Sequence, residues 1–175
     1  MVACGFNTLT PAFVYSLRIF ASYPIGNIST GGFWANGNAM GKLTSVPGYS
    51  PAVNATSIHM DDTYSHIPGA PFFQDTRGLV RTDDDQIIGV SMQGLIADTS
   101  HVRDILANQT GVAPLRWGEI DTFTTWNFQA AGKYAALSTG VFVANVWMGP
   151  PPDEDTISLM EYRLSQVLPG PLCED

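Results

Sequence analysis

The feature that most constrains this chain is a two-residue alternation that runs from residue 119 to residue 129. One side of the segment is polar and consists of Glu119, Asp121, Asn127 and Gln129. The other side carries Ile120, Thr122, Thr124, Trp126 and Phe128. Because successive side chains of a β-strand point to opposite faces of its sheet, the pattern predicts a strand with one wet face and one buried face.

Further strand-like segments lie on both sides of this one. Residues 12–22 are rich in aromatic and β-branched side chains, and Tyr23-Pro24-Ile25-Gly26 is expected to end that strand. Strands 77–82 and 86–96, joined by Asp83-Asp84-Asp85, are predicted to form a hairpin. Residues 156–164 are expected to be the closing strand, after a long apolar run over 134–148.

Residues 100–108 have helical rather than strand-like spacing. Val102, Ile105 and Leu106 are apolar one turn apart, and Ser100 is the expected N-cap. Gly111 and Pro114 follow as stop signals, so we expect one short helix.

Turn-forming residues are abundant, with 17 Gly and 12 Pro among 175 residues. Together with about eight strands and one short helix, they predict an all-β chain folded as a single antiparallel β-barrel, because closure leaves no unpaired edge. A two-layer sandwich stays an alternative. We expect one domain over residues 1–175, with an N-terminal arm at 1–11. Residues 49–76 are interpreted as an insertion or lid loop with one short strand near 56–60.

The chain is acidic, with eight Lys and Arg against 16 Asp and Glu and a formal net charge of -8. Its basic residues are scattered, whereas nucleic-acid binding needs a basic patch that replaces counterions on phosphates. We therefore expect neither nucleic acid nor an anionic membrane surface as a partner.

The termini bear on location and redox state. No run approaches the roughly 20 apolar residues that span a bilayer, and no signal peptide is visible at the start. These features favour a cytoplasmic protein, with a mature secreted chain as the alternative. Cys4 and Cys173 are either two free thiols or one bridge, and a bridge requires neighbouring end strands.

A series of short motifs in a fixed order is similar to a known family. The motifs are Thr30-Gly31-Gly32 with Gly37 and Gly41, Val46-Pro47-Gly48, Arg81-Thr82-Asp83-Asp84, Phe128-Gln129, Gly132 with Lys133-Tyr134-Ala135-Ala136-Leu137, and Val141-Phe142-Val143. Their order and spacing over residues 12–164 resemble the family catalogued as domain of unknown function 3237.

The resemblance implies a small β-barrel. Some fungal members of this family sit among natural-product enzymes, and one type closes an oxygen ring in a phenalenone polyketide by adding a phenol across an alkene. That implies intramolecular hydroalkoxylation of a small aromatic or polyketide substrate without a cofactor. The chain departs from the family at residues 49–74, which are longer and lack the usual Asp-Trp pair, and at Asp85, where an Asp-Asp-Gly turn usually ends. No role tied to the missing pair is carried over.

Hydroalkoxylation needs a base for the phenol, an acid for the alkene and a pocket that positions both. His66 has a pKa range that suits proton transfer near neutrality. An inward Arg18 could hold a phenolate oxygen, and a buried Glu161 could act as acid or base. The Tyr134 hydroxyl could donate to the ligand. The alternatives are an exposed loop histidine, ion-paired Arg18 and Glu161, and a core tyrosine.

A hollow barrel would offer a largely apolar pocket, and a filled core is the alternative. The expected lining residues are Tyr15, Met92, Trp126, Phe128, Asn145 and Trp147. His59 and Asp61 near His66 hint at a metal site, but no helical or hairpin spacing fixes them together, so we expect no metal.

We therefore expect a cofactor-free cyclase or isomerase that acts on an aromatic polyketide. The alternatives are a non-catalytic binding protein for an apolar metabolite and another non-redox lyase, such as a dehydratase or decarboxylase. Triad hydrolases are disfavoured by the missing Gly-x-Ser-x-Gly elbow, and nicotinamide or flavin enzymes by the missing strand–glycine-loop–helix unit. If the run at 134–148 faces outward, it would make a homo-oligomer interface.

Overall fold

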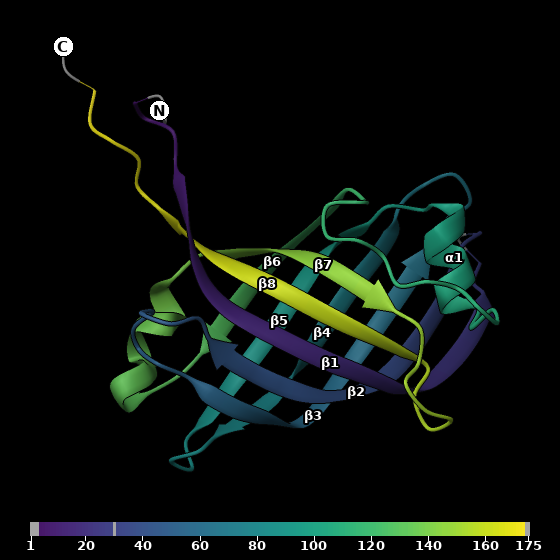
Figure 1. The fold of residues 1–175 in the computed structure, drawn as a ribbon, viewed down its shortest axis with the longest axis horizontal. Coiled ribbons are helices and arrows are strands. Elements are labelled where there is room, and N and C mark those ends of the chain that lie inside the picture. The colour runs from purple at the N-terminus through teal and green to yellow at the C-terminus, as the bar shows by residue number, and fades with distance from the viewer. Residues whose placement is uncertain (1–3, 30, 174–175) are drawn as a thin grey trace.

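The computed structural model describes residues 4–29 and 31–173, which form a closed antiparallel barrel (Figure 1). Its strands are β1 (Thr8–Asn27), β2 (Phe33–Ser45), β3 (Asn54–His66), β4 (Phe72–Thr82), β5 (Ile87–Ile96), β6 (Thr122–Gln129), β7 (Phe142–Gly149) and β8 (Ser158–Leu168). Two helical segments, α1 (Ser100–Leu106) and the 3₁₀ helix η1 (Gly132–Thr139), complete the fold. Each strand pairs with its neighbours in sequence, and β8 closes on β1. The predicted all-β barrel is confirmed.

β6 shows the predicted alternation of buried and exposed residues. Thr122, Thr124, Trp126 and Phe128 are buried, and the residues between them are exposed. β6 begins at Thr122, where pairing with β5 starts, and not at Glu119. The largest fully buried rings in the interior are Trp126, Tyr15, Tyr162, Phe13 and Phe142. Hydrophobic burial of these side chains is the main force that closes the barrel.

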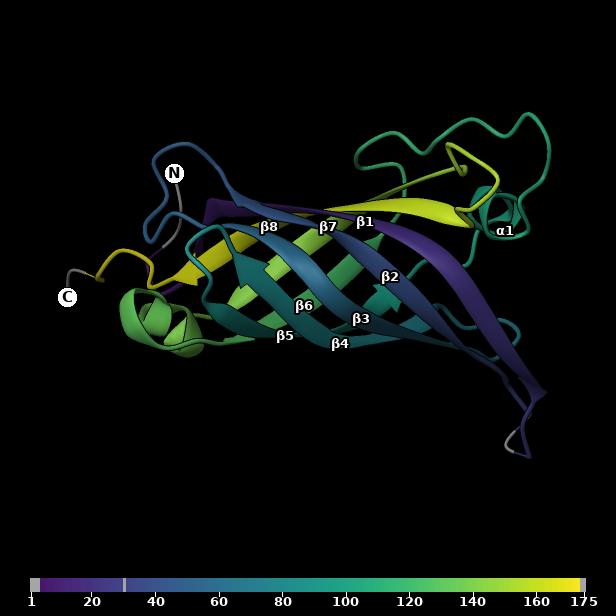
Figure 2. The ribbon, with the colours of Figure 1, turned by 90° about the horizontal axis from the view of Figure 1, so that it is seen from below.

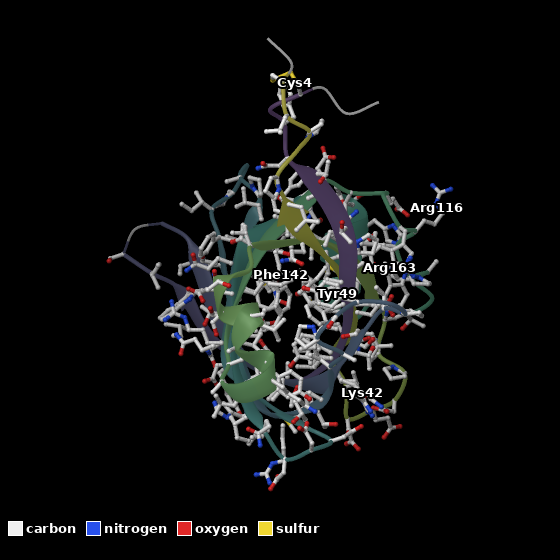
Figure 3. The ribbon with its side chains drawn as sticks, turned by 90° about the vertical axis from the view of Figure 1, so that its left-hand side faces the viewer. Cys4, Lys42, Tyr49, Arg116, Phe142 and Arg163 are labelled. Atoms are coloured by element: carbon white, nitrogen blue, oxygen red, sulfur yellow. A yellow bond between two sulfur atoms is a disulfide. The ribbon has the colours of Figure 1, made fainter. Side chains whose placement is uncertain are left out.

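The two ends of the barrel differ. Figures 1 and 2 show α1 at one end and η1 at the opposite end. At the η1 end, the Phe13 ring lies 4.8 Å from that of Tyr49 and 5.6 Å from that of Phe142. Figure 3 looks onto this end and shows Tyr49 and Phe142 within the ring of strands. Aromatic packing therefore fills the η1 end.

The interpretation of residues 49–76 as a lid loop is wrong. β3 occupies residues 54–66 and β4 begins at Phe72, so most of this segment belongs to the barrel wall. Two features hid β3 from sequence reasoning. A bulge between Ser57 and His59 shifts the two-residue period, and the buried side of the strand carries the polar residues Ser57 and Asp62.

The predicted end of the first strand is also wrong. β1 continues through Pro24 to Asn27, and the expected arm at 1–11 contributes the start of β1 from Thr8. The last β1 residue that pairs with β8 is Ile19, so the later part of β1 pairs with β2 alone. This part of β1 has an unpaired edge on the side away from β2, and such edge strands are where proline occurs in sheets.

The predicted helix is present but shorter, ending at Leu106, and the side chain of Thr99 rather than Ser100 accepts from Val102 N. Among the described residues, no helix has the length and apolarity to cross a membrane. The apolar run at 134–148 divides into η1 and β7. In β7, residues 142, 144, 146 and 148 are buried and face the barrel interior, whereas the residues between them are partly exposed on the outer face.

The structure decides between the two states of the cysteines. Cys4 and Cys173 form a disulfide, with Cα atoms 5.0 Å apart. Pairing of β1 with β8 brings the two ends of the chain together, and Gly5 N donates to Pro171 O over 3.1 Å beside the bridge. Residues 1–3, at the start of the expected arm, lie outside the described residues.

Candidate active site

A buried carboxyl group lies inside the barrel on β3. Asp62 is fully buried, and its Oδ1 accepts hydrogen bonds from Thr76 Oγ1 and, over 2.9 Å, from Gln74 Nε2. Its Oδ2 is buried without a hydrogen-bond partner among the described residues. An unpaired buried oxygen of this kind costs folding free energy, so it marks Asp62 as a candidate functional group.

The polar cluster around Asp62 extends across the barrel to β8. Tyr162 donates its hydroxyl to Gln74 Oε1 over 2.9 Å, and Gln74 Nε2 also lies 2.9 Å from the Tyr64 hydroxyl. The Tyr64 hydroxyl lies 3.1 Å from Met160 Sδ. The members of this cluster come from β3, β4 and β8, so only barrel closure brings them together.

Burial sets the protonation of the cluster. Burial raises the pKa of Asp62, and the hydrogen bonds from Thr76 and Gln74 only partly oppose it. Burial, together with the charge of Asp62, also raises the pKa of Tyr64 and Tyr162 well above the ordinary phenol value. Asp62 therefore holds its proton to a higher pH than an exposed aspartate, which suits a proton donor.

His66 lies on the same inward side of β3 as Asp62 and Tyr64, because these residues are spaced by two. It is the last residue of β3, and its ring stacks on Phe72 with centroids 4.3 Å apart. Its Nε2 lies 3.1 Å from Asp98 Oδ2. Tyr64 and His66 are partly exposed whereas Asp62 is fully buried. The row of side chains His66, Tyr64 and Asp62 therefore leads from the α1 end into the interior.

Asp98 joins this row to α1. Its Oδ1 accepts from Arg103 Nη1 over 2.7 Å, while Oδ2 faces His66. Burial acts to raise the pKa of Asp98, but the hydrogen bonds from Arg103 and His66 outweigh it and the pKa is lowered. Ionised Asp98 therefore ties the start of α1 to the end of β3.

Of the four predicted catalytic residues, only His66 lies near the buried cluster. Arg18 is on the outer face of β1, where it pairs with Asp153 at 2.5 Å. Glu161 is on the outer face of β8 beside Arg163, 3.3 Å away. Tyr134, in η1, donates its hydroxyl to Asp84 over 2.7 Å at the other end of the barrel.

The six predicted pocket residues separate by strand register. Tyr15, Met92, Trp126 and Phe128 point inward and are buried, with the Trp126 ring 5.8 Å from Tyr15 and 5.0 Å from Tyr162. Asn145 and Trp147 point outward, because β7 buries the residues between them. The inward residues are packed against one another, as in a filled core.

Grooves lie on the outer face of the barrel. One of about 650 Å³ brings Arg18, Trp147 and Glu161 together with Lys42 and Met40. Another, of about 530 Å³, includes Asn145. A further groove of about 460 Å³ is lined mainly by polar side chains of β4, β5 and β6. Within the described part of the chain, no three His, Cys, Asp or Glu side chains gather around a common metal position, and His59 and Asp61 are exposed.

Sequence reasoning missed Asp62, Tyr64, Gln74 and Tyr162. The available signal was the two-residue spacing of Met60, Asp62, Tyr64 and His66, which places all four on one side of a strand. The interpretation of residues 49–76 as a loop hides this spacing. Gln74 and Tyr162 gave no comparable sign, because their partners are distant in sequence.

Fold and site together define a small eight-stranded antiparallel barrel with a carboxyl-centred polar cluster in its interior. Residues 7–167 match the family described as "Protein of unknown function (DUF3237)", and the chain belongs to this family. No curated protein matches the sequence.

Solved structures share the fold at low sequence identity. A conserved protein of unknown function from Rhodopseudomonas palustris has a TM-score of 0.77 at 16% identity, with 93% of this chain and 99% of that chain covered. A beta-barrel like protein from Acinetobacter baumannii has a TM-score of 0.68 at 16% identity, covering 96% and 100%. An enzyme from Penicillium herquei has a TM-score of 0.57 at 14% identity, covering 94% and 98%. These similarities establish the fold alone.

Proposed function

We propose that this protein is a cofactor-independent cyclase that closes an oxygen heterocycle on an aromatic polyketide by intramolecular hydroalkoxylation of an olefinic phenol. The observation that carries the proposal is Asp62, a fully buried carboxyl with a raised pKa and one oxygen without a partner. Such a group can deliver a proton to a weakly basic carbon. The similarity in fold to a fungal enzyme gives additional support.

In the proposed reaction, Asp62 Oδ2–H gives its proton to one alkene carbon. The phenol oxygen bonds to the other alkene carbon and loses its own proton, so the product is an isomer of the substrate. If His66 donates Nε2–H to Asp98, its Nδ1 is left as the proton acceptor. Aromatic faces such as those of Tyr64 and Phe72 would stabilise the developing positive charge on carbon.

The substrate would enter at the α1 end, because aromatic rings fill the η1 end. Asp62 is fully buried, so side chains at the α1 end, Tyr64 and His66 foremost, must move to admit the reacting alkene. Positioning the two reacting groups can contribute about 7–11 kcal/mol in favourable cases, and acid–base catalysis adds about 10²- to 10⁴-fold.

The test is incubation of purified, chelator-treated protein with a prenylated phenalenone in D₂O without added cofactor. Chiral chromatography and mass spectrometry should find one enantiomer of the cyclic ether with a single deuterium on carbon. Asp62→Asn should abolish this product, whereas Asp75→Asn, a change on the outer face of β4, should not. A racemic product, or an active Asp62→Asn variant, would contradict the proposal.

A non-catalytic binding protein for an apolar metabolite is the second candidate, favoured by the outer groove that Met40, Trp147 and Leu159 line. It predicts saturable binding of the phenol without product. A dehydratase or decarboxylase working through the same acid would instead release water or carbon dioxide, which mass spectrometry separates from isomerisation.

A further inference from the structure

We infer that the groove on the outer face of β6, β7 and β8 is a second binding site, which takes an organic acid with an apolar body. This site lies on the opposite side of the barrel wall from Asp62 and does not depend on the function proposed above. Its volume of about 530 Å³ is in the range of small-molecule sites.

The groove forms where two strands separate. Pairing between β6 and β7 covers only Thr124–Trp126 and Phe142–Ala144, the shortest ladder of the barrel. Beyond Thr124 toward the α1 end, no β6 residue pairs with β7. The lining consequently includes inward residues such as Thr122 and Ala144 together with outward ones, so the groove reaches between the strands.

The walls are apolar and project from the surface. Phe123 is 73% exposed and Leu9 is 60% exposed, although both are large hydrophobic side chains. Val143 and Trp117 also line the groove. Exposed apolar area gathered around a groove is unfavourable in water and favours an apolar occupant.

Donor groups without partners face the same groove. Arg163 and Asn145 lie opposite each other on β8 and β7 and both line it. In the described residues, Arg163 donates only through Nε, to Glu161 at 3.3 Å, which leaves both terminal nitrogens free. The Asn145 Oδ1 accepts from Val146 N over 2.9 Å, which orients the amide, and its Nδ2 has no partner within residues 4–29 and 31–173.

A third polar group lies deeper in the groove. Thr122 is only 3% exposed, and its Oγ1 has no hydrogen-bond partner among the described residues. A buried hydroxyl without a partner is costly, and a ligand oxygen in the groove would remove that cost.

The Arg163 guanidinium gives the groove a group that can bind a carboxylate. The Arg163 guanidinium stacks on the Trp117 ring, with Cζ 4.1 Å from the centroid, so it is held at the rim. Arg163 pairs with Glu161 on its own strand. The loop that carries Trp117 adds a second pair, Arg116 and Glu119. Figure 3 shows Arg116 and Arg163 on the same flank of the barrel. A planar guanidinium and a side-chain amide match the two oxygens of a carboxylate.

The experiment is a calorimetric and NMR titration of the full chain with 2-naphthoate, decanoate and, as the uncharged control, 2-naphthalenemethanol. We expect one naphthoate per chain, a shift of the Trp117 indole N–H signal, and affinity for the alcohol that is about tenfold or more weaker, as expected for loss of a charge-assisted hydrogen bond. Preference for decanoate over naphthoate would assign the site to fatty rather than aromatic acids, and either preference supports the proposal.

Variants locate the site. Arg163→Met keeps most of the aliphatic part of the side chain, removes the guanidinium, and should weaken naphthoate binding about tenfold or more without changing binding of the alcohol. The matched control is Arg77→Met, on the outer face of β4. Asp62→Asn should leave naphthoate binding intact, which separates this site from the proposed active site. Equal binding of acid and alcohol, equal effects of the two arginine changes, or no binding would overturn the proposal. So would a dimer that Phe123→Ser dissociates and that binds no acid, because the groove would then be a subunit interface.

Discussion

Gln74 donates its side-chain N–H to Oδ1 of Asp62 over 2.9 Å, and both side chains are fully buried inside the barrel. Gln74 also accepts from Tyr162, so its amide links a carboxyl on β3 to a phenol on β8. A buried carboxyl held in this way on one oxygen presents the other oxygen for chemistry, and the following predictions start from that arrangement.

Asp62→Asn should remove a pH dependence of stability. Between the unfolded-state pKa, about 3.9, and the raised pKa of folded Asp62, the folded protein holds a proton that the unfolded chain has released. The free energy of unfolding therefore falls as the pH rises through this window, by about 1.4 kcal/mol per unit of pKa difference. Urea unfolding as a function of pH should show this fall in the wild type and a flatter profile in Asp62→Asn.

The control for that experiment is Asp75→Asn on the outer face of β4. A hydrogen bond from Arg77 lowers the pKa of Asp75, so its contribution to stability has the opposite sign: it is present above the unfolded-state pKa and is lost as the pH falls. If Asp62→Asn and Asp75→Asn changed the profile in the same direction, the assignment of a raised pKa to Asp62 would be wrong.

Tyr162→Phe should destabilise the barrel by about 1–3 kcal/mol, because Gln74 Oε1 would lose its donor in a buried site. Tyr23→Phe, at an exposed tyrosine of β1, should change stability by less than about 0.5 kcal/mol. Thermal and denaturant unfolding measure both. Equal effects of the two changes would show that the Tyr162 hydroxyl has no buried partner.

Truncation of an inward and of an outward side chain of β6 should change the free energy of unfolding by very different amounts. Trp126 is 1% exposed and its Nε1 donates to Thr124 Oγ1, so Trp126→Ala should cost about 3–5 kcal/mol. Phe123 points outward, so Phe123→Ala should cost less than about 0.5 kcal/mol. Denaturant unfolding tests the strand register, and a reversed order of the two costs would contradict it.

Asp98→Asn should loosen α1 from the barrel, because Asp98 holds both Arg103 and His66 through its ionised carboxylate. Hydrogen–deuterium exchange should become faster in residues 98–106 while β4 and β5 remain protected. Asp104→Asn, on α1 itself and paired only with Gln109, is the matched control. Unchanged exchange in Asp98→Asn would show that the contacts of Asp98 with Arg103 and His66 do not hold α1 against β3.

Local pattern was enough to predict much of the fold. β6 alternates strictly between buried and exposed residues, and the β4–β5 hairpin has a turn that its three aspartates mark. The helix at α1 has apolar residues one turn apart. In each case the residues that define the element are close in sequence, so propensity and periodicity act together.

The candidate site could not be predicted in the same way. The sequence leaves Arg18 and Glu161 either inward and catalytic or ion-paired, and strand register turns both outward into ion pairs. Asp62 was placed in a loop, because a bulge interrupts its strand and because a carboxylate is rarely buried. Whether a polar residue on a strand faces inward depends on where the bulges fall, which a single sequence does not specify.

The sequence by itself determined that the chain is all-β with about eight strands, favoured a barrel over a sandwich, and showed the resemblance to its family, because these properties follow from alternation, turn residues and motif order. Only the tertiary structure decided that Asp62, Gln74 and Tyr162 meet inside, that Cys4 reaches Cys173, and that Asn145 and Arg163 share an outer groove. The physical reason is that these contacts join strands far apart in sequence, and their register is fixed only when β8 pairs with β1.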